Sequence, residues 1–135
     1  MRSSVAGHSL TECEPLVESA LRFATTLLKY SETFYPFGLL SIAGDVQNVF
    51  TEQAPNNEVQ GGLIEELEWL ILERSFQTSE ICSVIVYSAS VESVDEDMID
   101  VIAVKITDSY GAEINRLYPY HFSTQQTLIG KPIVY

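Results

Sequence analysis

The segment 81–91 carries apolar side chains on both of its alternating faces, with Val84, Ile85 and Val86 at its centre. Successive side chains of a β-strand point to opposite faces of the sheet, so such a strand suits a position that is covered on both sides. The segment 98–107 repeats this two-sided apolar pattern. We therefore expect the core to form around a central strand at 81–91.

Runs rich in β-branched and aromatic residues predict further strands at 34–43, 46–51 and 112–122, and residues 128–135 can add a short last strand. The links between consecutive strands are short, which predicts hairpins and hence an antiparallel sheet. We predict an α+β domain with an antiparallel sheet of five to six strands and two helices on one face. The order is α-β-β-α-β-β-β with an optional final strand.

The first helix is expected to begin near Thr11, because Thr11 and Glu14 have the spacing of a capping box. Residues 1–10 are then a flexible N-terminal segment, and residues 11–135 form a single domain. The apolar stripe of this helix recurs at helical spacing through Val17, Ala20, Leu21, Ala24, Leu27 and Leu28.

The second helix is predicted from about Leu63 onward, since the preceding Gly61-Gly62 pair weakens helix propensity. Its inner stripe consists of Leu63, Leu67, Leu70 and Ile71, broadened on its sides by Ile64, Trp69, Leu72 and Phe76. Its acidic residues lie mostly outside.

Two helices on one face leave the second face of the sheet without a cover. Ile85, Ile99, Val101, Ala103 and several tyrosines cannot all lie under the helices. Part of that face is therefore expected to be covered by a partner or by a second copy of the chain.

The formal net charge is −12, from 7 Lys and Arg against 19 Asp and Glu in 135 residues. Binding to a nucleic-acid backbone depends on Lys and Arg that displace counterions, so this balance argues against nucleic acid as a ligand. The same sign of charge is repelled by an anionic membrane surface. With 46% hydrophobic residues in patterned stretches, the chain is also unlike a disordered one.

The N-terminal residues contain one cation but no apolar stretch typical of a secretory signal, and no run approaches the length needed to span a bilayer. The two cysteines, Cys13 and Cys82, stand far apart in the sequence, outside any CxxC motif. Reduced thiols and a cytoplasmic location are the simplest prediction.

Few residues could carry catalysis or bind a metal. His121 could act as a general base, but it lies in a predicted strand, and His8 lies in the N-terminal segment. The acidic residues 95–97 with Asp100 lack the register of an EF-hand. No nucleophile elbow, phosphate-binding glycine loop or zinc motif occurs. The sequence therefore predicts neither an enzyme nor a metal or cofactor site.

The acidic residues of the second helix and of the turn after the central strand could together form a negative surface that attracts a basic protein. Tyr118-Pro119-Tyr120 resembles Tyr35-Pro36-Phe37 and could add an aromatic recognition patch. The residues predicted to contact a partner are Glu65, Glu66, Glu68, Glu73, Glu92, Asp95, Glu96, Asp97, Tyr118 and Tyr120.

Three motifs carry a resemblance to a known group of proteins. Glu32-Thr33-Phe34-Tyr35-Pro36-Phe37-Gly38, Asp100-Val101-Ile102-Ala103-Val104 and Leu117-Tyr118-Pro119-Tyr120 resemble the pattern E-x-F-Y-P-F-G, D-x-I-A-V and L-P-Y of an uncharacterised family of small bacterial proteins. The closing motif carries one extra tyrosine. The resemblance implies a fold rather than an activity, and the small acidic members of the family are similar in character to toxin-immunity proteins.

Three hypotheses follow from these observations. The first is a non-catalytic, acidic, immunity-like protein that neutralises a basic bacterial toxin such as a nuclease. The second is a structural domain that forms a homodimer through the uncovered sheet face. The third is a small enzyme that uses Glu, Asp or His121 in a pocket between helices and sheet.

Overall fold

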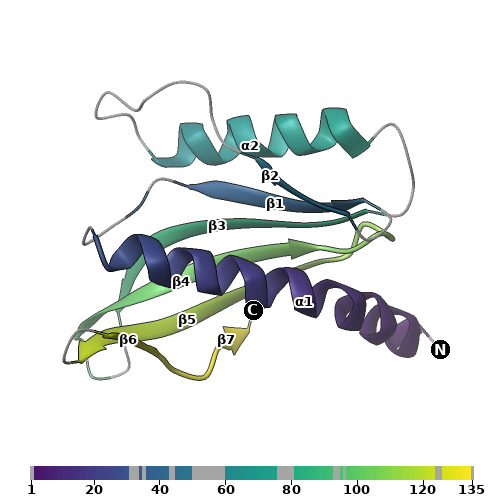
Figure 1. The fold of residues 1–135 in the computed structure, drawn as a ribbon. Helices are drawn as coiled ribbons and strands as arrows, with labels where there is room; N and C mark the ends of the chain where they lie inside the picture. The colour runs from purple at the N-terminus through teal and green to yellow at the C-terminus, as the bar shows by residue number, and fades with distance from the viewer. Residues whose placement is uncertain are drawn as a thin grey trace.

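An antiparallel sheet and two helices make up the described part of the chain (Figure 1). The computed structural model describes residues 2–30, 34, 36–42, 45–49, 60–75, 81–92, 95, 97–123 and 126–134. Its elements, in chain order, are α1 (Arg2–Leu28), β1 (Phe37–Ile42), β2 (Asp45–Val49), α2 (Gln60–Ser75), β3 (Ile81–Glu92), β4 (Met98–Thr107), β5 (Glu113–Ser123), β6 (Gln126–Ile129) and β7 (Ile133–Val134).

The strand order is β2-β1-β3-β4-β5-β6, and the two-residue β7 also pairs with β5. Every pairing is antiparallel. The α+β class and the predicted order of elements are confirmed. The prediction that segment 81–91 is an interior strand is confirmed as well, because β3 pairs with β1 on one side and with β4 on the other.

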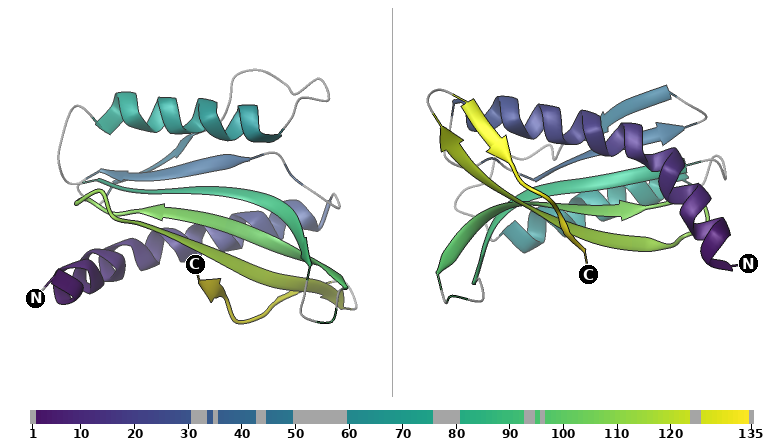
Figure 2. Two further views of the ribbon diagram at one scale, coloured as in Figure 1. Left: turned by 180° about the vertical axis from the view of Figure 1, so that it is seen from behind. Right: turned by 90° about the horizontal axis from the view of Figure 1, so that it is seen from below.

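The two helices pack on opposite faces of the sheet, so the prediction that both lie on one face is wrong. Neighbouring residues of one strand belong to different cores: Leu39 packs in the cluster under α1, whereas Leu40 packs with Leu67 and Ile71 of α2. Figure 1 shows α1 in front of the strands, and the view from behind in Figure 2 shows it beyond them. Strands that are apolar on both faces require a cover on each side, and each helix supplies one.

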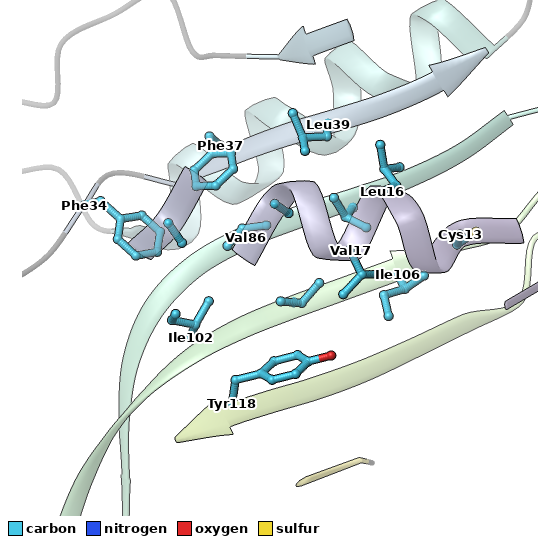
Figure 3. Close-up of a cluster of buried hydrophobic side chains, with 14 of the residues drawn as sticks. Cys13, Leu16, Val17, Phe34, Phe37, Leu39, Val86, Ile102, Ile106 and Tyr118 are labelled. Carbon is cyan, nitrogen blue, oxygen red and sulfur yellow. The ribbon is translucent and has the colours of Figure 1, made fainter. Parts of the chain in front are cut away.

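The core under α1 contains the stripe that helical spacing predicts, together with Cys13 and Leu16 (Figure 3). From the sheet, Phe37, Val86, Ile102 and other side chains project toward it. The Phe37 ring meets Phe23 of α1 edge to face, with 4.9 Å between ring centroids. This arrangement is favourable for aromatic pairs.

Two specific links join α1 to the sheet. Cys13 and Cys82 form a disulfide to β3, with their Cα atoms 5.7 Å apart, so the prediction of reduced thiols is wrong. The Arg116 guanidinium on β5 donates to both oxygens of the Glu14 carboxylate, at 3.0 and 2.6 Å. Spacing along the sequence could not reveal the disulfide, because its partners become neighbours only when α1 lies across β3.

The first helix begins at Arg2, so the expected start near Thr11 is wrong. That residues 1–10 form a flexible segment stays a prediction. Thr11 and Glu14 stand inside the helix, which also runs through Pro15. Once a helix has nucleated, each further residue adds a hydrogen bond at little cost, so the helix extends beyond a local capping signal.

Ile85, Val101 and Ala103 are buried within the single chain. The argument for a homodimer assumed that these residues lie on an open face. That assumption fails for these three residues, and Ile85 packs with Leu67 and Ile71 of α2.

Candidate functional site

The outer face of α2 presents a large aromatic side chain to solvent. Leu63, Leu67 and Ile71 face the sheet, as predicted. Trp69 is 65% exposed and Leu72 is 45% exposed, so the prediction that these two residues broaden the inner stripe is wrong. The helix can approach the sheet closely through Gly38, where an added Cβ would lie 3.4 Å from Ile71 Cδ1 and 3.3 Å from the Val84 carbonyl oxygen.

Carboxylates surround Trp69 on α2. Glu65 and Glu73, four positions before and after it, are exposed, and Glu68 is half-buried. A hollow of about 190 Å³ is lined by Glu65, Glu68, Trp69 and Leu72. An exposed indole bordered by negative charges is suited to contact a cationic group, because the ring face and the carboxylates both attract it.

A larger pocket, of about 500 Å³, lies between α2 and the end of the sheet where β4 turns into β5. Its apolar walls come from Ile71 and Leu72 of α2 and from Ile81 and Ile85 of β3. Its polar lining consists of Glu68, Ser83, Lys105, Thr107, Asp108, Ser109 and Glu113.

Lys105 lies between two carboxylates in this pocket. Its ammonium pairs with Glu68 of α2 and, at 3.0 Å, with Glu113 of β5. The hydrogen bond that the Lys105 ammonium donates to Glu68 is the main cause that raises the pKa of Lys105. The Lys105 ammonium is therefore held in its charged form and is already engaged by the protein.

Asp108 is a buried carboxylate, 4% exposed, in the turn between β4 and β5. Its Oδ1 accepts hydrogen bonds from the Tyr110 and Ala112 amides, both at 2.9 Å. Gly111, with φ of +86°, gives this turn a backbone conformation that other residues rarely adopt. Oδ2 is buried and has no hydrogen-bond partner within the described part of the chain.

The predicted acidic surface is divided into two parts. Glu65, Glu66, Glu68 and Glu73 lie on α2, whereas Glu92, Asp95 and Asp97 lie at the turn between β3 and β4. This turn and the β4–β5 turn lie at opposite ends of the strands (Figures 1 and 2). The separation of the two clusters can be measured along β4. Met98 directly follows the acidic turn, and Lys105 pairs with Glu68 of α2. These two residues are seven strand positions apart, or roughly 23 Å. Glu96 lies outside the described residues.

The two tyrosines predicted to contact a partner belong to the core, which corrects that prediction. Tyr118 and Tyr120 are 7% and 8% exposed and pack under α1. The Tyr118 hydroxyl accepts a hydrogen bond from Arg116 at 3.1 Å. Burial, followed by the nearby Asp100 charge, raises the pKa of Tyr120. Alternation along β5 places both rings on the face that α1 covers.

Of the residues that the enzyme hypothesis invokes, His121 does not line this pocket, whereas the carboxylates Glu68, Asp108 and Glu113 do. His121 is exposed on β5, opposite Leu128 of β6. Asp100 is exposed and accepts a hydrogen bond from the Ser90 hydroxyl at 2.9 Å. Among the described residues, no group of three His, Cys, Asp or Glu side chains is placed to hold a metal ion.

Sequence reasoning missed four residues on which the candidate site depends: Trp69, Lys105, Asp108 and Glu113. The sequence does indicate Lys105 as a candidate site residue, because it is the one charged residue inside the apolar run from Val101 to Ile106. The sequence also indicates a structural role for Asp108, since this residue directly precedes the turn Ser109-Tyr110-Gly111. The exposure of Trp69 had no such signal, because it depends on how α2 rotates against β1 and β3.

Comparisons with protein-family models, with curated proteins and with solved structures found no match to this chain. Within the described segments, neither helix combines the length and apolar character that crossing a bilayer requires.

Proposed function

We propose that this chain is a non-catalytic binding domain that recognises a basic protein through the outer face of α2. Its most concrete form is an immunity-like or antitoxin-like protein that neutralises a basic bacterial toxin. The observation that carries this proposal is Trp69, 65% exposed and bordered by carboxylates. Tryptophan is the residue type most typical of interface positions that dominate binding energy.

The charge on α2 determines what kind of partner fits. Glu65, Glu66, Glu68 and Glu73 share this helix with a single cation, Arg74. Arg74 donates to the Gln47 side chain of β2 at 3.4 Å, on the side of the helix nearest the sheet edge. A partner that brings Lys or Arg to Trp69 would gain both cation–π and ionic contacts.

The acidic turn formed by Glu92, Asp95 and Asp97 has a different part in this proposal. It lies too far from α2 to join the same contact, yet it contributes to the net charge of −12. A field of that sign raises the rate at which a basic partner arrives and also favours solubility. In this proposal the partner protein contacts α2 directly, and the acidic turn attracts it only at long range.

Capture experiments with matched variants test the proposal. The immobilised chain is incubated with a native lysate and washed at graded salt, in parallel with Trp69→Ala and with Glu65→Gln/Glu73→Gln. The control is Glu92→Gln/Asp95→Asn, which removes the same charge at the distant turn. We expect basic proteins that the wild type and the control retain at low salt, and that both α2 variants lose.

Binding constants for a captured protein make the test quantitative. We expect Trp69→Ala to cost about 2 kcal/mol, roughly thirtyfold in Kd. Tyr30→Ala removes another exposed aromatic, at the end of α1, and should leave Kd unchanged. Retained proteins that are acidic, or that all variants retain equally, would contradict the proposal.

The cytoplasmic location also stays a prediction, and the Cys13–Cys82 disulfide weighs against it, because such bonds persist mainly in oxidising compartments. Trapping thiols in intact cells with an alkylating reagent, followed by denaturation and mass analysis, tests it. Alkylated cysteines would support a cytoplasmic protein, and protected cysteines would support an oxidising compartment.

A further inference from the structure

The pocket between α2 and the β4–β5 turn is a separate feature from the outer face of α2. At about 500 Å³ it is within the range of small-molecule sites. It shares Glu68 and Leu72 with the hollow beside Trp69, but its other walls belong to the sheet. Its chemistry can therefore be considered independently of the proposed protein partner.

The ionic lining of the pocket is unbalanced. Glu68, Asp108 and Glu113 supply three carboxylates, whereas Lys105 supplies one ammonium, which leaves a net charge of −2. The Lys105 ammonium is shared between Glu68 and Glu113. The negative charge of Asp108 thus has no cation paired with it among the described residues.

The buried position of Asp108 makes this imbalance significant. A carboxylate oxygen that is removed from water and left without a hydrogen-bond donor is unfavourable. The two turn amides satisfy Oδ1, so the oxygen without a partner is Oδ2. A positive group held in the pocket beside Asp108 would compensate the negative charge of this carboxylate.

The apolar lining of the pocket indicates what the uncharged part of the ligand is. Ile71, Ile81 and Ile85 form an apolar wall along one side, suited to an aliphatic chain. An anionic occupant would meet three carboxylates and a lysine that is already paired. A neutral polar occupant would leave the charge of Asp108 uncompensated.

We propose that this pocket binds an ammonium or guanidinium group carried on an aliphatic chain, with the cation near Asp108 and the chain against the isoleucines. The same chemistry occurs in small aliphatic amines and in the side chain of a lysine or arginine from another protein. The proposal does not depend on Trp69 or on a protein partner.

Calorimetric titration with small probes tests the proposal. The probes are 1,4-diaminobutane and agmatine, with 1,4-butanediol and succinate as the neutral and anionic controls. We expect binding of the two cations, weakened by added salt, and no binding of the controls. Equal binding of butanediol, or binding of succinate in place of the amines, would overturn the proposal.

Matched variants locate the site. Asp108→Asn keeps an oxygen for the two turn amides but removes the charge, and we expect it to weaken amine binding at least about tenfold. Asp100→Asn makes the same change at an exposed residue that does not line the pocket, and it should leave the affinity within about twofold. An equal effect of both variants, or no effect of Asp108→Asn, would contradict the assignment.

A second variant covers the case in which Asp108→Asn does not fold. Ser83 is buried and lines the pocket, so Ser83→Leu should narrow the pocket and weaken amine binding. An unchanged affinity for the amines in folded Ser83→Leu would place the ligand elsewhere. Trp69→Ala should bind the amines normally, which separates this result from a failure of the proposed function.

The two sources of the ligand are distinguished with blocked tripeptides, Gly-Lys-Gly and Gly-Arg-Gly. Binding of the free amines alone identifies a small-molecule site. Binding of the peptides alone identifies a receptor for a side chain of a partner. Binding of neither class refutes the proposal.

Discussion

At the scale of single residues, two side chains have an exposure opposite to their polarity. Trp69 is apolar and largely exposed, whereas Asp108 is charged and buried. Oδ1 of Asp108 accepts two turn amides, whereas Oδ2 has no hydrogen-bond partner among the described residues. These two residues mark the outer face of α2 and the pocket behind it.

Glu14 gives a prediction at this scale. Its bidentate hydrogen bonds with Arg116 are the main cause that lowers the pKa of the Glu14 carboxyl. Since the folded-state pKa is below the unfolded one, the pair contributes stability at neutral pH and loses it as the pH falls through the folded pKa. Because Glu14 is partly exposed, we expect a contribution of about 1 kcal/mol.

Urea unfolding of the wild type and of Glu14→Gln checks this prediction. The difference in unfolding free energy should be largest near pH 7, should shrink as the pH falls through the lowered folded-state pKa of Glu14, and should disappear once this carboxyl is protonated in the folded state as well. Glu18→Gln, an exposed residue on the same helix, is the control. A difference that is the same at all pH values would show that Glu14 acts through packing and not through its charge.

At the scale of elements, α1 is tied to the sheet by a continuous apolar stripe and by covalent and ionic links. Its stripe was predictable, because the spacing of Val17, Ala20 and Ala24 follows from the helical period. The first residue of α1 was not predictable, since the capping signal at Thr11 is local and the helix continues through it. The bounds of β4 were predicted correctly as 98–107. The alternation of apolar side chains along a strand is also a property of neighbouring residues, so the sequence shows it directly.

The disulfide gives a prediction at this scale. It joins residues 69 positions apart, so loop-closure entropy alone would stabilise the fold by about 4 kcal/mol. We expect a reducing agent to lower the free energy of unfolding by 2–4 kcal/mol, measured with urea. The variant Cys13→Ser/Cys82→Ser should show the lower stability and no response to the reductant. Equal stability of the wild type with and without reductant would contradict this role.

At the scale of the whole molecule, the sheet has a helix on each face and the chain has a net charge of −12. Two copies that met through their α2 faces would bring carboxylates together, which is unfavourable. Ile85, Val101 and Ala103, three of the residues on which the dimer hypothesis rested, are buried within the single chain.

We therefore expect the chain to be monomeric. Light scattering at micromolar concentration and physiological salt should give the mass of one chain, 15.1 kDa. Raising the salt should not increase the mass if the surface lacks a self-complementary patch. A stable species of twice this mass at all salt concentrations would restore the homodimer hypothesis.

The sequence by itself determined the α+β class, the order of the elements and the acidic character, because periodicity and composition are properties of neighbouring residues. Only the tertiary structure decided which face each helix covers, that Cys13 meets Cys82, and that Tyr118 and Tyr120 are core residues. It also decided that Lys105, Asp108, Glu68 and Glu113 line one pocket and that the two acidic clusters lie apart. These outcomes depend on contacts between residues far apart in the chain, and a local pattern shows that a side chain is apolar or charged without showing what it will meet.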